Sequence, residues 1–100
     1  IYTKMRVDVK KSDKKDKKYV AVFTDDDKKK TIIHFGLKNS TTYLDTGDKK
    51  LRDAYKARHR AVYNKAKPMS ASRLSYEIIW GNSTSLSKNI KDYKNKYGFK

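Results

Sequence analysis

The stretch YVAVFT at residues 19–24 decides the fold, because it is rich in β-branched and aromatic residues and is the best strand candidate in the chain. Before it, apolar and charged residues alternate over 5–9 (MRVDV), which is the period of a half-buried strand. After it, TIIHF at 31–35 predicts a third strand that Gly36 closes. The three runs together predict a three-stranded antiparallel meander.

Two charged segments connect the predicted strands. The segment KKSDKKDKK at 10–18 contains no apolar residue, and we expect a solvated turn or loop there. The segment DDDKKK at 25–30 predicts a second charged turn. The N-terminal part thus divides into a lysine-rich strand and loop at 1–18 and two strands within 19–36.

The periodicity changes after the predicted sheet. Residues 38–47 are small and polar, and we expect a loop there. A helix is predicted over 48–65, with Asp48 as its N-cap, because a carboxylate accepts the unpaired N–H groups of a first turn. One face of this helix is predicted to carry Leu51, Ala54, Tyr55, Ala57, Arg58 and Val62.

Two shorter helices are predicted in the C-terminal third. The first covers 71–80, begins at Ser70 or Ser72 and stops at Gly81. The second covers 85–97, is capped by Ser83 or Ser85, and places Leu86, Ile90, Tyr93 and Tyr97 on one face. Gly98 ends it and Phe99 folds back. A sheet followed by about three helices predicts an α+β fold in a single domain, 1–100.

Composition limits the class of protein. The chain has 100 residues, 26 Lys and Arg against 11 Asp and Glu, and a formal net charge of +15. Self-repulsion at this charge predicts marginal stability alone and greater stability with a partner that supplies anions or covers surface. The absence of Cys excludes disulfides and thiol chemistry. No stretch approaches the ~20 apolar residues of a membrane span, so none is expected.

Candidate catalytic residues are few. His34 and His59 lack the close, fixed spacing of a metal-binding pair. Asp45, Asp48 and Asp53 could gather a hard cation such as Mg²⁺, but a turn residue, a helix cap and an ion-pair partner are the simpler interpretations. We therefore expect no enzyme, no metal and no cofactor. The alternative, ranked third among the functions considered, is a metal-dependent nuclease built on Asp45, Asp48 and His59.

Basic residues suggest polyanion binding, with a merely solubilising surface as the alternative. Residues 49, 52, 56 and 60 fall along one side of the predicted helix and could follow a row of phosphates. Lys outnumbers Arg 21 to 5, which favours contact without base recognition, since Lys acts as a point charge. The candidate residues are Lys10, Lys11, Lys14, Lys15, Lys17, Lys18, Lys49, Arg52, Lys56, Arg58 and Arg60.

Aromatic residues form a second candidate set, either in the core or at a protein interface, where Tyr and Trp commonly serve as anchors. Its members are Tyr55, Trp80, Tyr93, Tyr97 and Phe99. The sequence leaves Tyr2, Tyr43, Tyr63 and Tyr76 unassigned.

Four segments carry a resemblance to a known family: KTIIHFG at 30–36, RDAYKARHR at 52–60, LSYEIIWG at 74–81 and SLSKNIKDYKNKYGF at 85–99. Over about residues 29–100 the chain resembles a family of small basic proteins of unknown function from nucleocytoplasmic large DNA viruses. The segment AVYNKAKPMS at 61–70 departs from the family's usual pattern.

The resemblance implies a viral setting and presence in the particle, but no catalytic residue. Our leading hypothesis is a non-enzymatic minor capsid protein that bridges or lines capsid units inside the virion. Its partners would be major or minor capsid subunits, met after synthesis in the host cytoplasm or virus factory. The second hypothesis is a virion protein that binds and condenses duplex DNA without sequence specificity.

Overall fold

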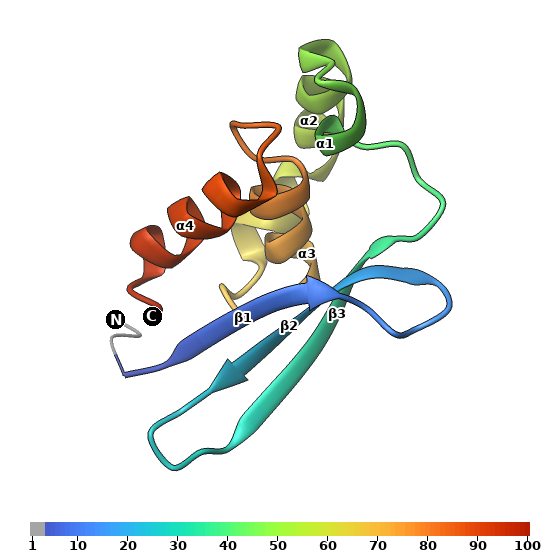
Figure 1. The fold of residues 1–100 in the computed structure, drawn as a ribbon. Coiled ribbons are helices and arrows are strands. Elements are labelled where there is room, and N and C mark those ends of the chain that lie inside the picture. Colours follow the sequence, from blue (N-terminus) through green and yellow to red (C-terminus); the bar gives the residue numbers. More distant parts are fainter. Residues whose placement is uncertain (1–3) are drawn as a thin grey trace.

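The computed structural model describes residues 4–100, in which a three-stranded antiparallel sheet precedes a group of helices (Figure 1). Strand order in the sheet is β1-β2-β3. The predicted α+β class with an N-terminal meander is confirmed. The elements are β1 (Arg6–Lys11), β2 (Lys17–Thr24), β3 (Lys30–Leu37), α1 (Tyr43–Thr46), α2 (Lys49–Lys65), α3 (Ala71–Leu74), the π-helix η1 (Ser75–Ile79) and α4 (Leu86–Tyr97).

One face of the sheet forms the floor of the core. Val7 of β1 pairs with Phe23 of β2, and Tyr19 pairs with Phe35 of β3. Val7, Ala21, Phe23 and Phe35 are almost fully buried. Ala21 and Phe23 alternate along β2 as a strand with one covered face requires, while Val20 is buried on the opposite face.

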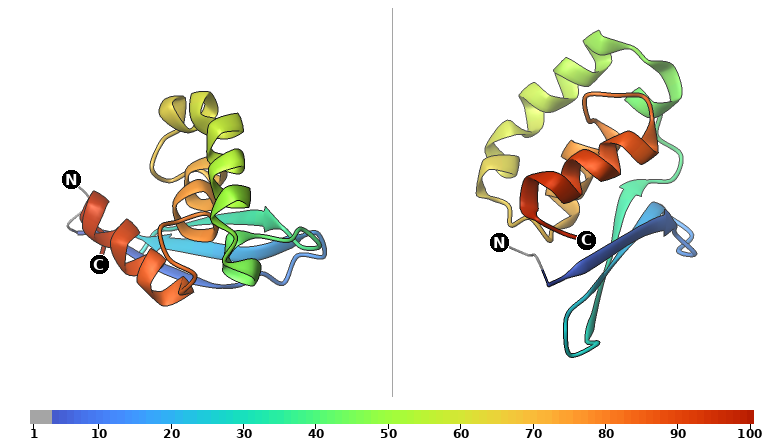
Figure 2. Two further views of the ribbon diagram at one scale, coloured as in Figure 1. Left: turned by 90° about the horizontal axis from the view of Figure 1, so that it is seen from above. Right: turned by 60° about the vertical axis from the view of Figure 1, so that its left-hand side comes forward.

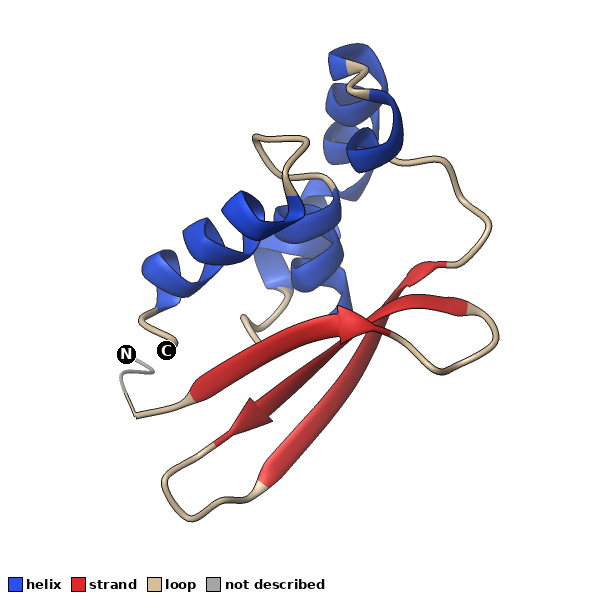
Figure 3. Ribbon diagram, viewed as in Figure 1, coloured by secondary structure: helices blue, strands red, loops and turns tan. Residues whose placement is uncertain are grey.

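The helices stack upon one another above this floor (Figures 2 and 3). α3 and η1 lie against β3, α4 lies against η1, and α2 contacts α1, α3 and η1. Leu74, Ile78 and Ile79 are fully buried between the sheet and α4. No helix within residues 4–100 has both the length and the apolar character of a membrane span.

The end of the chain returns to the sheet, as predicted for Phe99. Gly98 ends α4 with a left-handed backbone, φ 78°. The Phe99 ring lies 5.2 Å from that of Phe23, centroid to centroid. Lys100 then extends the edge of β1: its carbonyl accepts from the Val7 N–H at 3.1 Å, and its N–H donates to Met5 at 2.9 Å. These two hydrogen bonds connect the segment that follows α4 to β1.

The lysine-rich start is more regular than the sequence predicted. β1 continues through Lys11 and β2 begins at Lys17, so the connection is only residues 12–16 rather than a loop over 10–18. Ladder hydrogen bonds to neighbouring strands outweigh the weak strand propensity of Lys. Lys10 and Lys11 stay exposed, whereas Lys17 and Lys18 are half-buried. The first three residues of the predicted segment 1–18 lie outside the described part of the chain.

Two helical predictions also need correction. The expected loop at 38–47 contains the one-turn helix α1, because Thr42 and Asp45 form a capping box. The helix predicted over 71–80 changes to a π-helix at Ser75, with Trp80 N–H bonded to the Ser75 carbonyl at 3.0 Å. Asp48 caps α2 as predicted, and of the two serines that the sequence offered at each of the next two helices, Ser70 and Ser85 are the caps.

The helix predicted over 48–65 is present, but it does not present the expected apolar face to a core. α2 has no buried residue. Leu51 and Tyr55 are half-buried, whereas Ala54, Ala57 and Arg58 are exposed and Val62 retains 54% of its accessible surface. α2 packs mainly on α1, α3 and η1 rather than on the sheet, so part of its apolar face remains uncovered.

Candidate protein-docking cleft and basic surface

The β1–β2 hairpin carries the most exposed basic cluster of the predicted set. Lys10, Lys11, Lys14 and Lys15 are all exposed, and Lys17 is half-buried. The hairpin projects from one end of the sheet (Figure 1). This cluster is therefore available to an external anion.

The basic residues of α2 divide between surface and interior. Lys49, Arg58 and Arg60 are exposed. Arg52 instead lies over the Tyr43 ring at 4.9 Å, and Lys56 lies over the Tyr76 ring at 5.0 Å. Burial, and then the charge of Arg52, lower the pKa of Lys56. Of the four basic residues predicted to lie along one side of this helix, at 49, 52, 56 and 60, two thus contact rings within the molecule.

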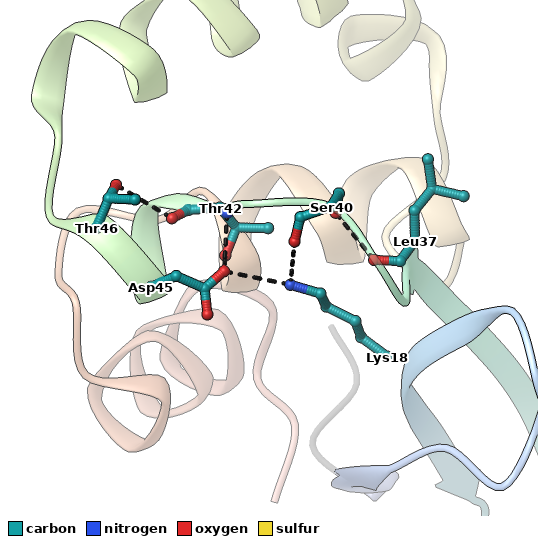
Figure 4. A network of polar contacts seen from close by, with 6 residues as sticks. All are labelled: Lys18, Leu37, Ser40, Thr42, Asp45 and Thr46. Carbon is teal, nitrogen blue, oxygen red and sulfur yellow. Dashed lines mark hydrogen bonds and ion pairs between the residues drawn. The ribbon is translucent and has the colours of Figure 1, made fainter.

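Lys18 also acts within the molecule (Figure 4). Its Nζ donates to the Ser40 carbonyl at 2.6 Å and lies 3.3 Å from Oδ2 of Asp45. The same carboxylate accepts the Thr42 N–H at 2.8 Å and the Thr42 hydroxyl at 2.9 Å. Hydrogen bonds from Thr42, supported by Lys18, lower the pKa of Asp45. This network ties the segment after β3 to β2.

A cleft of about 460 Å³ opens beside this network. Its walls come from three parts of the fold: the end of β3, the inner side of α2, and the α3–η1 helix. Gly36 lies in its wall with φ +81°, and a Cβ there would come within 2.6 Å of Ile79 Cδ1. Glycine thus allows β3 and η1 to meet closely at the base of the cleft.

The rim of the cleft combines exposed apolar side chains with cations. Leu37 at the end of β3 is 64% exposed, and Val62 on α2 is 54% exposed. Lys17 and Arg58 also line the cleft, and neither forms an ion pair with any residue between 4 and 100. No carboxylate is among the described residues that line it. The cleft thus joins the hairpin cluster to the basic surface of α2.

A stack of three rings supports the α2 wall. The Tyr55 ring lies 4.2 Å from that of Trp80, at an interplanar angle of 8°. On its other side lies the His59 ring at 4.0 Å, whose Nδ1 is 2.9 Å from the Tyr55 carbonyl oxygen. Tyr63 stacks on Tyr76 at 3.9 Å. The two stacks attach α2 to η1 and to Trp80, which follows it.

The predicted aromatic set occupies the core. Trp80, Tyr93, Tyr97 and Phe99 are buried, and Tyr55 is half-buried against them. Of the unassigned tyrosines, Tyr43 and Tyr76 are buried and Tyr63 is half-buried, whereas Tyr2 lies outside the described residues.

A partly buried polar network connects Glu77 of η1 with α4 and α2. The Glu77 carboxylate accepts from the Tyr97 hydroxyl at 2.5 Å and from Lys96 Nζ at 2.8 Å. Lys96 also donates to the Tyr63 hydroxyl at 2.9 Å, and Arg73 donates to the Tyr97 hydroxyl at 2.9 Å. Burial and the bond to Glu77 raise the pKa of Tyr97. Burial alone would lower the pKa of Lys96, but its bonds to Glu77 and Tyr63 raise it.

Sequence reasoning missed a buried asparagine that organises the connection between η1 and α4. Asn89 is 1% exposed, and its amide donates to the carbonyls of Ile78 and Ser83 at 2.9 and 2.7 Å. Its Oδ1 accepts the Ser83 N–H at 3.1 Å. A Cβ on Gly81 would lie only 2.7 Å from the Asn89 side chain. A polar residue on the predicted apolar face of this helix was the available signal.

The candidate metal residues are separated and serve other purposes. Asp48 accepts the N–H groups of Lys50 and Leu51 as the cap of α2, and Asp53 pairs with Arg52. His34 Nδ1 lies 2.6 Å from the Ser12 hydroxyl. The described part of the chain brings no three His, Cys, Asp or Glu residues together as metal ligands would be.

Comparison with known proteins gives two matches. A family of unknown function, DUF5754, matches residues 7–59. The uncharacterized protein L851 of Acanthamoeba polyphaga mimivirus is 40% identical to this chain over an alignment of 78 residues. The alignment covers 72% of this chain and 78% of the relative. No solved structure matches. The relative is viral, as the resemblance implied, but the family match includes the lysine-rich hairpin, which the expected span of 29–100 left out.

Proposed function

This chain belongs to the family of unknown function DUF5754, and we propose that it is a non-enzymatic basic structural protein of a large DNA virus particle. In this role it is a minor capsid component that bridges or lines capsid units from inside the shell. Its partners are other virion proteins with acidic surfaces. The viral relative supports this setting.

The surface around the cleft carries this proposal. Between residues 4 and 100, carboxylates pair with only four cations: Lys18, Arg52, Lys88 and Lys96. Most of the 26 Lys and Arg side chains therefore have no carboxylate partner within residues 4–100. Exposed apolar side chains lie between the unpaired cations of the hairpin and of α2. A surface that joins apolar and basic groups is suited to an acidic protein partner.

Fractionation of gently opened virus particles tests the proposal. Empty shells are separated from released DNA, and the chain is followed by mass spectrometry. A packed protein interface keeps the chain with the shells at high salt, because burial of apolar surface is little affected by screening. Absence from the shells would contradict a capsid role.

The hairpin cluster favours one second candidate, a DNA-condensing protein. Lys10, Lys11, Lys14 and Lys15 are exposed together and could contact successive phosphates. Binding to duplex DNA would then be independent of sequence and fall with salt, at a log–log slope of about −0.9 for each phosphate contacted. A shallow slope, or release of the chain from DNA near physiological salt, would count against it.

A further inference from the structure

The cleft between β3 and α2 is specific enough to suggest what occupies it. We propose that it binds an extended segment of a partner protein, which inserts an apolar side chain and places its own carboxylates on Lys17 and Arg58. This inference rests on the proposed structural role and adds the chemistry of the partner.

The shape and lining of the cleft fit an apolar anchor. A volume of about 460 Å³ lies in the usual range for pockets that enclose a ligand group, which is about 300–1,000 Å³. Leu37 and Val62 reach the rim from different elements and are exposed by more than half. Exposed apolar side chains that border a concave surface gain stability when a partner covers them.

The charges of the cleft fit an acidic segment. Lys17 and Arg58 contribute from β2 and α2, and no lining residue among 4–100 is a carboxylate. The positive net charge of the chain raises the potential around both cations. It also disfavours a second copy of the same chain as the occupant. Carboxylates of a different protein supply the complementary charge.

The arrangement of the rings favours a protein segment over a nucleic acid. Recognition of unpaired bases uses open aromatic faces on which the bases stack. Both faces of Tyr55 are already covered, by Trp80 and by His59. Trp80 itself is only 7% exposed. Beside the exposed His59 and Arg58, the large exposed apolar side chains of the cleft are the aliphatic Leu37 and Val62, which suit an apolar side chain better than a base.

A library of random peptides displayed on phage, selected against the full chain, tests the inference. We expect the selected peptides to combine an apolar residue with neighbouring Asp or Glu. A selected peptide is then labelled with fluorescein, and its affinity for each variant is measured by fluorescence anisotropy. We expect Leu37→Ser, Val62→Ser and Arg58→Glu each to weaken binding by about tenfold, which corresponds to ~1.4 kcal/mol.

Arg60→Glu is the matched control, because it makes the same charge change on the same helix outside the cleft. It should weaken binding by less than about threefold, through long-range charge alone. The circular dichroism spectra of all variants should match that of the wild type, since the changed side chains are exposed. Selected peptides without apolar residues, or equal losses for Arg58→Glu and Arg60→Glu, would overturn the inference.

The outcome is independent of the particle experiment. If the chain stays with the shells while Leu37→Ser and Val62→Ser bind the peptide normally, the structural role stands and the cleft is not the docking site. If a single-stranded oligonucleotide binds the chain and displaces the peptide, and Val62→Ser leaves its binding unchanged, a nucleic acid is the occupant and the inference is wrong.

Discussion

The two longest helices are attached to the molecule in different ways. α4 buries Asn89, Tyr93 and Tyr97, and its end is fastened to β1 through Phe99 and Lys100. α2 is longer, yet none of its residues is buried. Two ring stacks attach α2 to the π-helix.

This difference indicates that one part of the molecule provides stability and that the other, α2, provides binding surface. The sheet, η1 and α4 share one core, so most of the folding free energy comes from their apolar contacts. α2 contributes less burial and leaves its basic and apolar side chains on the surface, where they border the cleft. We expect mutations to reflect this division.

The largest expected effect comes from truncation in the shared core. Ile78→Ala removes a fully buried side chain and should lower the free energy of unfolding by about 2–5 kcal/mol. Val62→Ala removes a similar group from exposed α2 and should change it by less than ~0.5 kcal/mol. Urea denaturation measures both. Similar losses in the two variants would contradict the proposed division.

The second largest loss of stability is expected from removal of the buried Asn89 amide in α4. Asn89→Ala leaves the Ile78 carbonyl without its partner and should destabilise the fold by about 1–3 kcal/mol. Asn95→Ala, on the exposed side of the same helix, is the control and should be neutral or slightly stabilising. Thermal unfolding distinguishes them, and a neutral Asn89→Ala would mean that water replaces the amide.

The stacked rings should control α2 locally. Tyr55→Leu keeps apolar bulk but loses the stack on Trp80, worth about 0.5–1.5 kcal/mol. Amide hydrogen exchange should then accelerate in α2 while the amides of α4 keep their protection. Equal acceleration in both helices would mean that α2 opens only with the whole fold.

Local patterns predicted most of the secondary structure. The meander follows from apolar runs bounded by charged turns, and Asp48, Ser70 and Ser85 were recognisable as caps. α1 also had a local signal, since Thr42 and Asp45 have the spacing of a capping box. The π-helix had none, because its wider turn is set by packing against β3 and α4.

The cleft depends on tertiary structure and could not be found from spacing. Lys17 and Arg58 belonged to the predicted basic set, but only the fold brings them to one cleft. The exposure of Val62 was not predicted either, because the helical pattern places it on the apolar face of its helix. Leu37 carried no prediction, since it lies between Gly36 and the polar segment 38–47. The opposite difference concerns three basic residues that were predicted to bind a polyanion but make contacts within the molecule: Lys18, Arg52 and Lys56.

The smallest expected effect is on the pH dependence of stability, through the polar network that joins α4 to α2. Lys96 and Tyr97 both have pKa values raised in the folded state, in which they bond to Glu77. Their stabilising contribution is therefore complete below the unfolded pKa values near 10 and is lost as pH rises through the folded values. The stability of the wild type should decline above about pH 10 for this reason.

Other lysines also lose charge in that range, which relieves self-repulsion and acts in the opposite direction. The informative quantity is thus the difference between variants in the urea midpoint from pH 8 to 11. Glu77→Gln should make the alkaline decline shallower, because it removes the carboxylate that raises both pKa values. Asp92→Asn, at the exposed pair with Lys88, should leave the decline unchanged. Parallel curves for the wild type and Glu77→Gln would show that α4 and α2 are not coupled through this network.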